Sequence, residues 1–312
     1  MPEQTTTQLI QEFITHLYAA GRAQSTIFCY LHELDHLACL LGDKPAGRIT
    51  DNDIDSAVAR IAAEKRKNRK RSAATMNRIK SAYRSFLYWA FESERIPCNP
   101  AVRLRRARAY SCPTMPITAA EVAVLLRTIH QSDDVYADRD EALFATYAYT
   151  GIRRSEALSL TLRDYDRDNG VLCLPRMKNG AKQVKVVPPI LTDMLTKRVR
   201  SALRECAPMD RLLLFPGRAG DKPLSPRHVR DRFDKWKKLA GIRAGLTIHS
   251  FRAGYATALY ETTGDIFLVA HALGHRDIGT TMRYIRTNSS VLKRAVEYTF
   301  QRPGRKNISY VN

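Results

Sequence analysis

The chain has 312 residues and 44% of them are hydrophobic, which is enough for two domains with sizeable cores. Its formal net charge of +20 favours a polyanionic partner, with nucleic acid as the first candidate and a membrane surface as the rival. No long uncharged apolar run could cross a bilayer, and no secretory signal is recognisable. Six cysteines without metal-finger spacing predict reduced structural thiols in a cytosolic protein and no zinc site.

Apolar residues recur at helical spacing through the first hundred residues. We expect two helices between residues 7 and 41, with Ser25 or Thr26 capping the second of them. Thr50 is expected to cap a third helix, and a fourth should run from Ala74 to about Glu92. Three aromatic residues of this fourth helix are expected in the core rather than against DNA bases: Phe86, Tyr88 and Trp89.

Basic residues gather before, on and after the fourth predicted helix. Such a run is as often a solvated loop as a contact to the DNA backbone, where each neutralised phosphate adds salt-sensitive affinity. The candidate DNA contacts here are Lys65, Arg66, Lys67, Arg69, Lys70, Arg71, Arg78, Arg84, Arg103, Arg105 and Arg106. The arginine-rich and proline-bounded segment 101–116 is the predicted linker between a helical domain over 1–100 and a second domain over 117–312.

The second domain is expected to mix helices with a small antiparallel sheet, so the whole chain is predicted to be mainly α-helical. Thr118 and Glu121 form a capping box that starts its first helix. From residue 160 to 188 the hydrophobic period changes to two, which predicts strands, and Asn179-Gly180 predicts a hairpin turn between them. Further helices are expected over 190–206 and 226–240.

The stretch from residue 247 to 286 contains two short helical patterns, the second ended by a glycine that suits a left-handed cap. His249 and Arg252 are three residues apart, so they are neighbours on the first of these helices. His275 follows the capping glycine directly, and a short turn that begins with threonine then presents Tyr284.

These residue types suit one kind of chemistry. Arginine presents a rigid fork of donors that matches phosphate oxygens, and histidine can donate a hydrogen bond or carry a proton near neutral pH. Tyrosine can act as a covalent nucleophile, but its free pKa of about 10 requires a base or cationic neighbours. The combination indicates phosphoryl transfer, in which positioning and charge neutralisation supply most of the catalysis.

Two sequence segments, HSFR and LGHRDIGTTMRY, resemble the carboxy-terminal signature of the tyrosine recombinases, the lambda-integrase family of site-specific DNA recombinases. The segment TGIRRSE, residues 150–156, resembles the Thr-Gly-x-Arg-x-x-Glu box of the same family, with Glu156 as a supporting residue. One departure is Ala253, where the family often has histidine after the arginine. By this resemblance the catalytic residues are Arg153, Lys178, His249, Arg252, His275 and Tyr284.

The resemblance also implies a reaction. Tyr284 attacks a phosphodiester and forms a 3′-phosphotyrosyl link, while the two catalytic arginines neutralise the phosphate and His275 hydrogen-bonds it. His249 is the base or hydrogen-bond partner, and Lys178 protonates the leaving 5′ oxygen. Lys182 and Lys185 are nearby alternatives for this lysine, and Tyr298 and Tyr310 are rival nucleophiles at a different distance from His275.

The resemblance further implies a helical, SAM-like core-binding domain, no cofactor and no metal. The expected partners are double-stranded DNA and further copies of the chain, in a tetrameric synapse on DNA, with no membrane involved. Three more basic residues are candidate DNA contacts: Arg218, Arg227 and Arg230. The alternatives are a nicking-closing enzyme like the type IB topoisomerases and a non-catalytic DNA-binding protein of the same fold.

Overall fold

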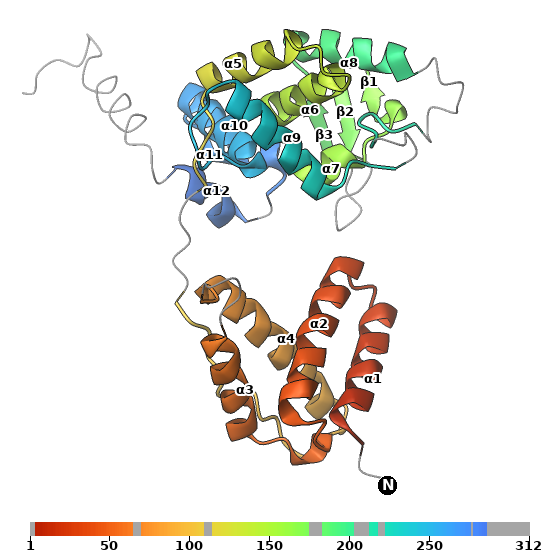
Figure 1. The fold of residues 1–312 in the computed structure, drawn as a ribbon, viewed down its shortest axis with the longest axis vertical. Coiled ribbons are helices and arrows are strands. Elements are labelled where there is room, and N and C mark those ends of the chain that lie inside the picture. The colour runs from red at the N-terminus through yellow and green to blue at the C-terminus, as the bar shows by residue number, and fades with distance from the viewer. Residues whose placement is uncertain are drawn as a thin grey trace, which may run out of the picture. The chain divides into compact units, whose positions relative to one another are not determined.

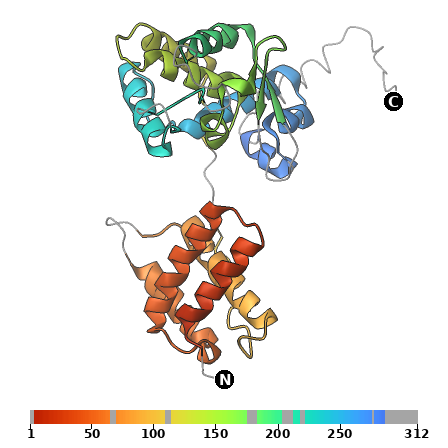
Figure 2. The same cartoon turned by 90° about the vertical axis from the view of Figure 1, so that its right-hand side faces the viewer.

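The computed structural model describes residues 4–64, 70–108, 114–174, 183–202, 212–217, 222–275 and 277–285. The chain forms two compact units, Met1–Cys112 and Pro113–Asn312 (Figures 1 and 2). The described part of the first unit is helical, and that of the second combines helices with one small antiparallel sheet. The predicted fold class is therefore confirmed. None of the described helices is long and apolar enough to cross a membrane.

The first unit is a bundle built around the apolar faces of its helices: α1 (Thr6–Ala19), α2 (Gln24–Leu41), the short η1 (Ala46–Arg48), α3 (Asp51–Ala63) and α4 (Ala73–Glu92). Thr50 caps α3 through a capping box with Asp53, as predicted for this helix start. Helix α2 instead begins after Ala23, which has no side chain that could cap it. The prediction that Ser25 or Thr26 caps α2 is therefore wrong.

The aromatic residues of α4 do not share one environment. Phe86 is fully buried, and the Trp89 ring lies 5.3 Å from the ring of Phe13. Tyr88 is 57% exposed, so the prediction that it belongs to the core is wrong. The reason is geometric, because two residues along a helix turn a side chain by about 200°, away from the buried face that carries Phe86.

The chain stays packed on α4 well after this helix ends. Ala101 and Leu104, which fall in the predicted linker, are buried in the core of the first unit. The side-chain amide of Asn77 in α4 donates to the carbonyl of Ala107 at 2.8 Å, and the amide of Ala107 donates back at 2.8 Å. The first unit therefore includes the beginning of the arginine-rich segment.

The second unit surrounds helix α6 (Ala137–Thr150), which contacts α5, α7, α8 and α10. Phe144 of α6 packs against Phe233 and Phe251, with ring centroids 5.6 and 5.9 Å apart. The other helices in the described part of this unit are α5 (Ala119–His130), α7 (Arg154–Leu158), η2 (Leu162–Asp164), α8 (Pro189–Ala202), α9 (Pro226–Leu239), α10 (Ile248–Thr263), α11 (Ile266–Leu273) and α12 (Ile278–Ile285). Thr118 and Glu121 cap α5 as predicted.

The sheet consists of β1 (Tyr165–Asp166), β2 (Val171–Leu174) and β3 (Gln183–Val186), antiparallel in the order β1-β2-β3. On β3 the apolar side chains point outward, because Val184 and Val186 are 51% and 76% exposed. Lys185 between them is only 3% exposed and pairs across the strands with Leu172, which is fully buried. The strand prediction holds, but a lysine occupies the inward face of β3.

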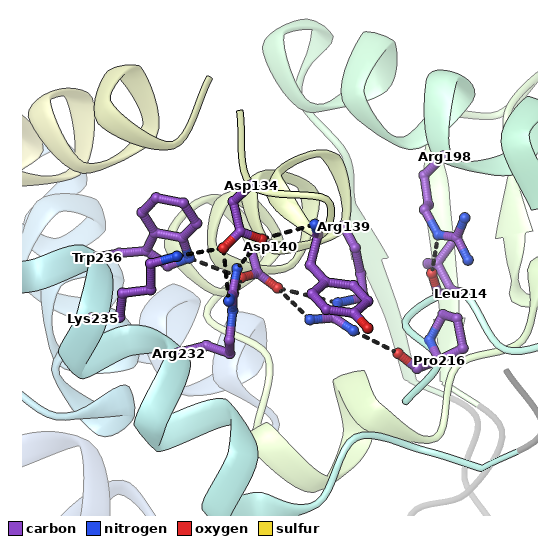
Figure 3. Close-up of polar contacts among 10 residues, drawn as sticks. Asp134, Arg139, Asp140, Arg198, Leu214, Pro216, Arg232, Lys235 and Trp236 are labelled. Carbon is purple, nitrogen blue, oxygen red and sulfur yellow. Dashed lines mark hydrogen bonds and ion pairs between the residues drawn. The ribbon is translucent and has the colours of Figure 1, made fainter. Parts of the chain in front are cut away.

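A buried carboxylate joins α6 to α9 (Figure 3). Asp140 is fully buried and accepts hydrogen bonds from Arg139 Nη2 at 2.8 Å, Arg232 Nε at 2.5 Å and Trp236 Nε1 at 2.8 Å. Asp134 accepts two further bonds from Arg232 and one from Lys235. Hydrogen bonds from Arg232 are the largest cause that holds the pKa of Asp134 well below its usual range. The network fixes α9 against the core helix.

Candidate active site

The TGIRRSE segment forms the turn between α6 and α7. Gly151 ends α6 in the left-handed conformation, with φ 58°, and an added Cβ there would lie 2.5 Å from Tyr255. Arg153 precedes the first residue of α7, and its amide donates to Glu156 Oε2 at 2.9 Å. Its Nη1 donates to Glu156 Oε1 at 2.7 Å. Glu156 thus holds both the backbone and the guanidinium of Arg153, as predicted.

Arg252 lies on the first turns of α10 and is only 5% exposed. Its Nη1 donates to the carbonyl of Gly151 at 2.7 Å, and its Nη2 donates to the carbonyl of Leu273 at 2.7 Å. One guanidinium therefore connects the turn before α7 to the end of α11. This arrangement uses the fixed fork of arginine, which has five N–H donors in one plane.

Small residues follow Arg252 because another part of the chain packs closely on α10. The amide of Ile117 donates to the carbonyl of Ser250 at 3.1 Å, and an added Cβ at Gly254 would lie 2.3 Å from the carbonyl oxygen of Ile117. Ala253 is buried beside this contact, at 1% exposure. Sequence reasoning noted Ala253 as a departure but missed the need for glycine at position 254.

His275 links Arg252 to helix α12. Its Nε2 lies 2.9 Å from Nη2 of Arg252, and its Nδ1 lies 2.8 Å from Oγ1 of Thr281, a fully buried residue of α12. Because a guanidinium only donates, Nε2 is the acceptor, and Nδ1–H then donates to the threonine hydroxyl. Two hydrogen bonds therefore fix both the tautomer and the orientation of the imidazole.

Two more polar side chains approach this centre. Lys185 donates from β3 to the carbonyl of Ala272 in α11, and burial, followed by repulsion from Arg252, lowers its pKa to about 8. His249 lies exposed on the first turn of α10. Loss of hydration, followed by the positive charges of Arg154 and Arg252, lowers the pKa of His249 below its ordinary value of 6.5.

The sequence of each unit matches a known domain. Residues 4–94 match the SAM-like N-terminal domain of phage integrases, and residues 116–290 match the phage integrase family. The chain belongs to the phage integrase family. The resemblance inferred from the motifs is thereby confirmed.

Individual members of the phage integrase family align over most of this chain. The tyrosine recombinase XerC of Alcanivorax borkumensis is 29% identical over 281 residues, which is 89% of each chain. In structure, the chain is similar to the XerH site-specific recombinase bound to a palindromic difH substrate, with TM-score 0.71, 18% identity and coverage of 95% and 85%. A lambda integrase tetramer bound to a Holliday junction is similar with TM-score 0.69, 19% identity and coverage of 91% and 78%.

The structure of this phage integrase family member brings Arg153, Arg252 and His275 together around the end of α11. His249 shares α10 with Arg252. Tyr284 belongs to α12, a helix where the sequence suggested a turn, and its side chain is outside the described residues. Lys178, the proposed catalytic lysine, lies outside the described residues, and so does its alternative Lys182. The second alternative, Lys185, is described.

The candidate DNA contacts fall into three groups. Arg71 and Arg78 are paired with Glu64 and Glu33, each at 2.7 Å, so their charges are already engaged within the first unit. Arg78 is nevertheless exposed, and so are seven further candidates: Lys70, Arg84, Arg103, Arg105, Arg106, Arg227 and Arg230. Five lie outside the described residues: Lys65, Arg66, Lys67, Arg69 and Arg218. Within the described part of the chain, no group of three His, Cys, Asp or Glu side chains could hold a metal ion.

Proposed function

We propose that this chain is a site-specific DNA recombinase that cuts and rejoins duplex DNA through a 3′-phosphotyrosyl intermediate. The observation that carries the proposal is the convergence of Arg153, Arg252 and His275 at the end of α11, directly before the helix that contains Tyr284. Membership of the phage integrase family and the net charge of +20 support it.

In the proposed first step, Oη of Tyr284 attacks the phosphorus of one phosphodiester, and the bond from phosphorus to the 5′ oxygen breaks. Arg153 and Arg252 stabilise the negative charge that develops on the non-bridging oxygens. A guanidinium carries five N–H donors, so one arginine can bind both backbone carbonyls and a phosphate. Losing one such donor costs about 2–4 kcal/mol of transition-state stabilisation.

Protons move in two places. The hydroxyl proton of Tyr284 passes to His249, whose lowered pKa keeps the imidazole neutral and able to accept it. Lys178 donates a proton to the leaving 5′ oxygen. The energy of the broken bond is kept in the phosphotyrosyl link, so the 5′ hydroxyl of a second strand can reverse the chemistry without ATP. The expected hydrogen bond from His275 to the phosphate requires Nε2 to carry a proton and to leave Arg252, which is its partner in this structure.

The partners follow from the same reaction. Strand exchange needs two duplexes and one nucleophile for each cut strand, which fits a tetramer of this chain on DNA in the cytoplasm. A lambda integrase tetramer on a Holliday junction has the same fold and supports this assembly. A nicking-closing enzyme would need no such assembly, so the mass of the complex on DNA separates the two activities. A non-catalytic DNA-binding protein would bind DNA without forming a covalent link.

The test traps the covalent intermediate. Labelled duplex carrying candidate sites and a nick is mixed with protein in EDTA, quenched with detergent and run on a denaturing gel. We expect a slow protein–DNA band that Tyr284→Phe abolishes and Tyr18→Phe, at an exposed position of α1, retains. A band that persists in Tyr284→Phe would show that another residue is the nucleophile. Tight binding without any band would favour the non-catalytic alternative.

A further inference from the structure

Four consecutive backbone carbonyls at the end of α11 accept hydrogen bonds from side chains of other elements. Gln183 Nε2 donates to His271 at 3.4 Å, and Lys185 donates to Ala272. Arg252 donates to Leu273 at 2.7 Å, and Arg153 donates to Gly274 at 3.3 Å. Carbonyls at the end of a helix lack partners within the helix and carry partial negative charge, so three cations here stabilise the terminal turn.

Two of these cations are assigned to the phosphate in the proposed reaction, and the third is not. Lys185 reaches the helix end from β3 and is almost fully buried. Burying a lysine is unfavourable unless its charge finds a partner, and a valine would satisfy an inward strand position more easily. The Ala272 carbonyl and the carboxylate of Glu156 supply the attraction that this site needs.

The end of α11 matters because the site is built on it. His275 follows Gly274, and its amide donates to the carbonyl of Ala270 at 2.9 Å within the same terminal turn. Its imidazole then contacts Arg252 and Thr281. Movement of this turn would therefore move the histidine and the anchor of the arginine together.

We propose that Lys185 is a positioning residue for DNA cleavage: it holds the terminal turn of α11, so that Arg252 and His275 keep their places when a phosphate binds. The phosphate draws N–H donors of the two arginines toward itself, and Lys185 keeps the helix end neutralised meanwhile. This role rests on the proposed recombinase function. It assigns Lys185 no contact with the DNA.

The charge of Lys185 is the property to test. The charged groups that face it are Arg252 on α10, Arg153 directly before α7 and Glu156 on α7. Strand β2 presents the apolar Leu172, and α11 presents a carbonyl. With a pKa of about 8, the side chain is charged at neutral pH and loses its proton as pH rises through that value. An arginine at this position would stay charged throughout, since its pKa exceeds about 12.

The kinetic experiment measures single-turnover formation of the covalent complex on nicked duplex, from about pH 6.5 to about pH 9.5. The full-length variants are Lys185→Met, Lys185→Arg and, as control, Lys197→Met at an exposed ion pair on α8. We expect Lys185→Met to cleave at least about tenfold more slowly at neutral pH with unchanged DNA affinity. The wild-type rate divided by the Lys185→Arg rate should be constant below about pH 7 and fall above about pH 8, which a packing role would not produce.

A second readout needs no DNA and therefore separates failure of this proposal from failure of the proposed function. Hydrogen exchange of the Gly274 and His275 amides should be faster in Lys185→Met than in wild type, and unchanged in Lys197→Met. Unchanged exchange in Lys185→Met would overturn the proposal whether or not the protein cleaves DNA. So would a flat rate ratio across the pH range. If Lys185→Met does not fold, the Lys185→Arg pH profile decides.

Discussion

Arg252 connects three parts of the site through single hydrogen bonds. Its buried guanidinium binds the Gly151 and Leu273 carbonyls and contacts the His275 imidazole. A lysine could not make these contacts together, because its ammonium is a compact point charge without a planar fork. The role of a side chain in this site therefore depends on its orientation as well as on its charge. The two histidines differ in how firmly their rings are held. His275 is fixed by partners on both ring nitrogens, whereas His249 is exposed.

The environment of His249 predicts how the rate of DNA cleavage falls at low pH, which is the acid limb of the pH–rate profile. Its pKa is lowered from 6.5, so the neutral base persists as pH falls through that value. We therefore expect the rate of covalent-complex formation to decline only below about pH 6.5. His249→Gln should remove this acid limb while lowering the rate at neutral pH. An unchanged limb in His249→Gln, measured by single-turnover trapping, would assign the titration to another group.

At the scale of elements, the second unit depends on buried charges and on glycines that allow close packing. Asp140 of α6 holds α9 through Arg232 and Trp236 and also accepts a hydrogen bond from its neighbour Arg139 (Figure 3). Gly151 allows α6 to end against Tyr255 of α10. Gly151 lies in the turn that leads to Arg153, and Asp140 fixes α9 against the helix that precedes this turn.

Replacing Asp140 with asparagine should strongly destabilise the second unit. The change leaves Arg139 and Arg232, with side chains only 7% and 13% exposed, without their shared carboxylate, at a cost of about 3–5 kcal/mol. Asp138→Asn is the matched control, because Asp138 is 60% exposed in its pair with Lys197 and should change stability by less than about 1 kcal/mol. Denaturant unfolding followed by circular dichroism measures both. Equal losses in the two variants would contradict the structural role of Asp140.

Gly151→Ala tests the close approach of α6 and α10. The left-handed backbone with φ 58° costs an alanine about 1–2 kcal/mol, and its Cβ would also lie 2.5 Å from Tyr255. Gly264→Ala in the same unit has φ 68° and open space around the new Cβ, so it carries the backbone cost alone. We expect thermal unfolding to show a clearly larger loss for Gly151→Ala. If the two losses match, Tyr255 does not restrict this position.

For the whole molecule, the net charge of +20 is the leading feature. In the structure, some of the basic side chains are paired with carboxylates, and others are largely exposed. Arg232 forms ion pairs with Asp134 and Asp140 inside the second unit, and Arg71 and Arg78 are paired with glutamates. Arg227 and Arg230 on the first turns of α9 lie 3.9 and 3.8 Å from the carboxylate of Asp231, but their side chains remain 84% and 63% exposed. We expect these exposed side chains to contact DNA phosphates.

Salt dependence of DNA binding tests this division. Each arginine that neutralises a phosphate contributes about −0.9 to the slope of log K against log salt. Arg227→Gln and Arg230→Gln should each make the slope shallower by about one, whereas Lys197→Gln should not alter it. Fluorescence anisotropy titrations at several salt concentrations provide the slopes. Wild-type slopes in both arginine variants would place these residues away from the DNA backbone.

The sequence by itself determined the family and the fold class, together with the order of the motifs that match the family. These depend on local information: helix periodicity, caps such as Thr118 with Glu121, and motif spacing along α10 and α11. The support of Arg153 by Glu156 was also predictable, because three residues separate them at a helix start.

Only the tertiary structure decided which side chains meet across the chain. Lys185 lies in a valine-rich strand, and its inward orientation became clear from its pairing with Leu172 on the buried face of the sheet. Gln183 reached the carbonyl of His271, and Asp140 met Arg232, through contacts between residues far apart in sequence. Periodicity predicts whether a residue lies on the buried or the exposed face of its helix or strand. It does not predict which residues pack against that face, because they belong to a different element.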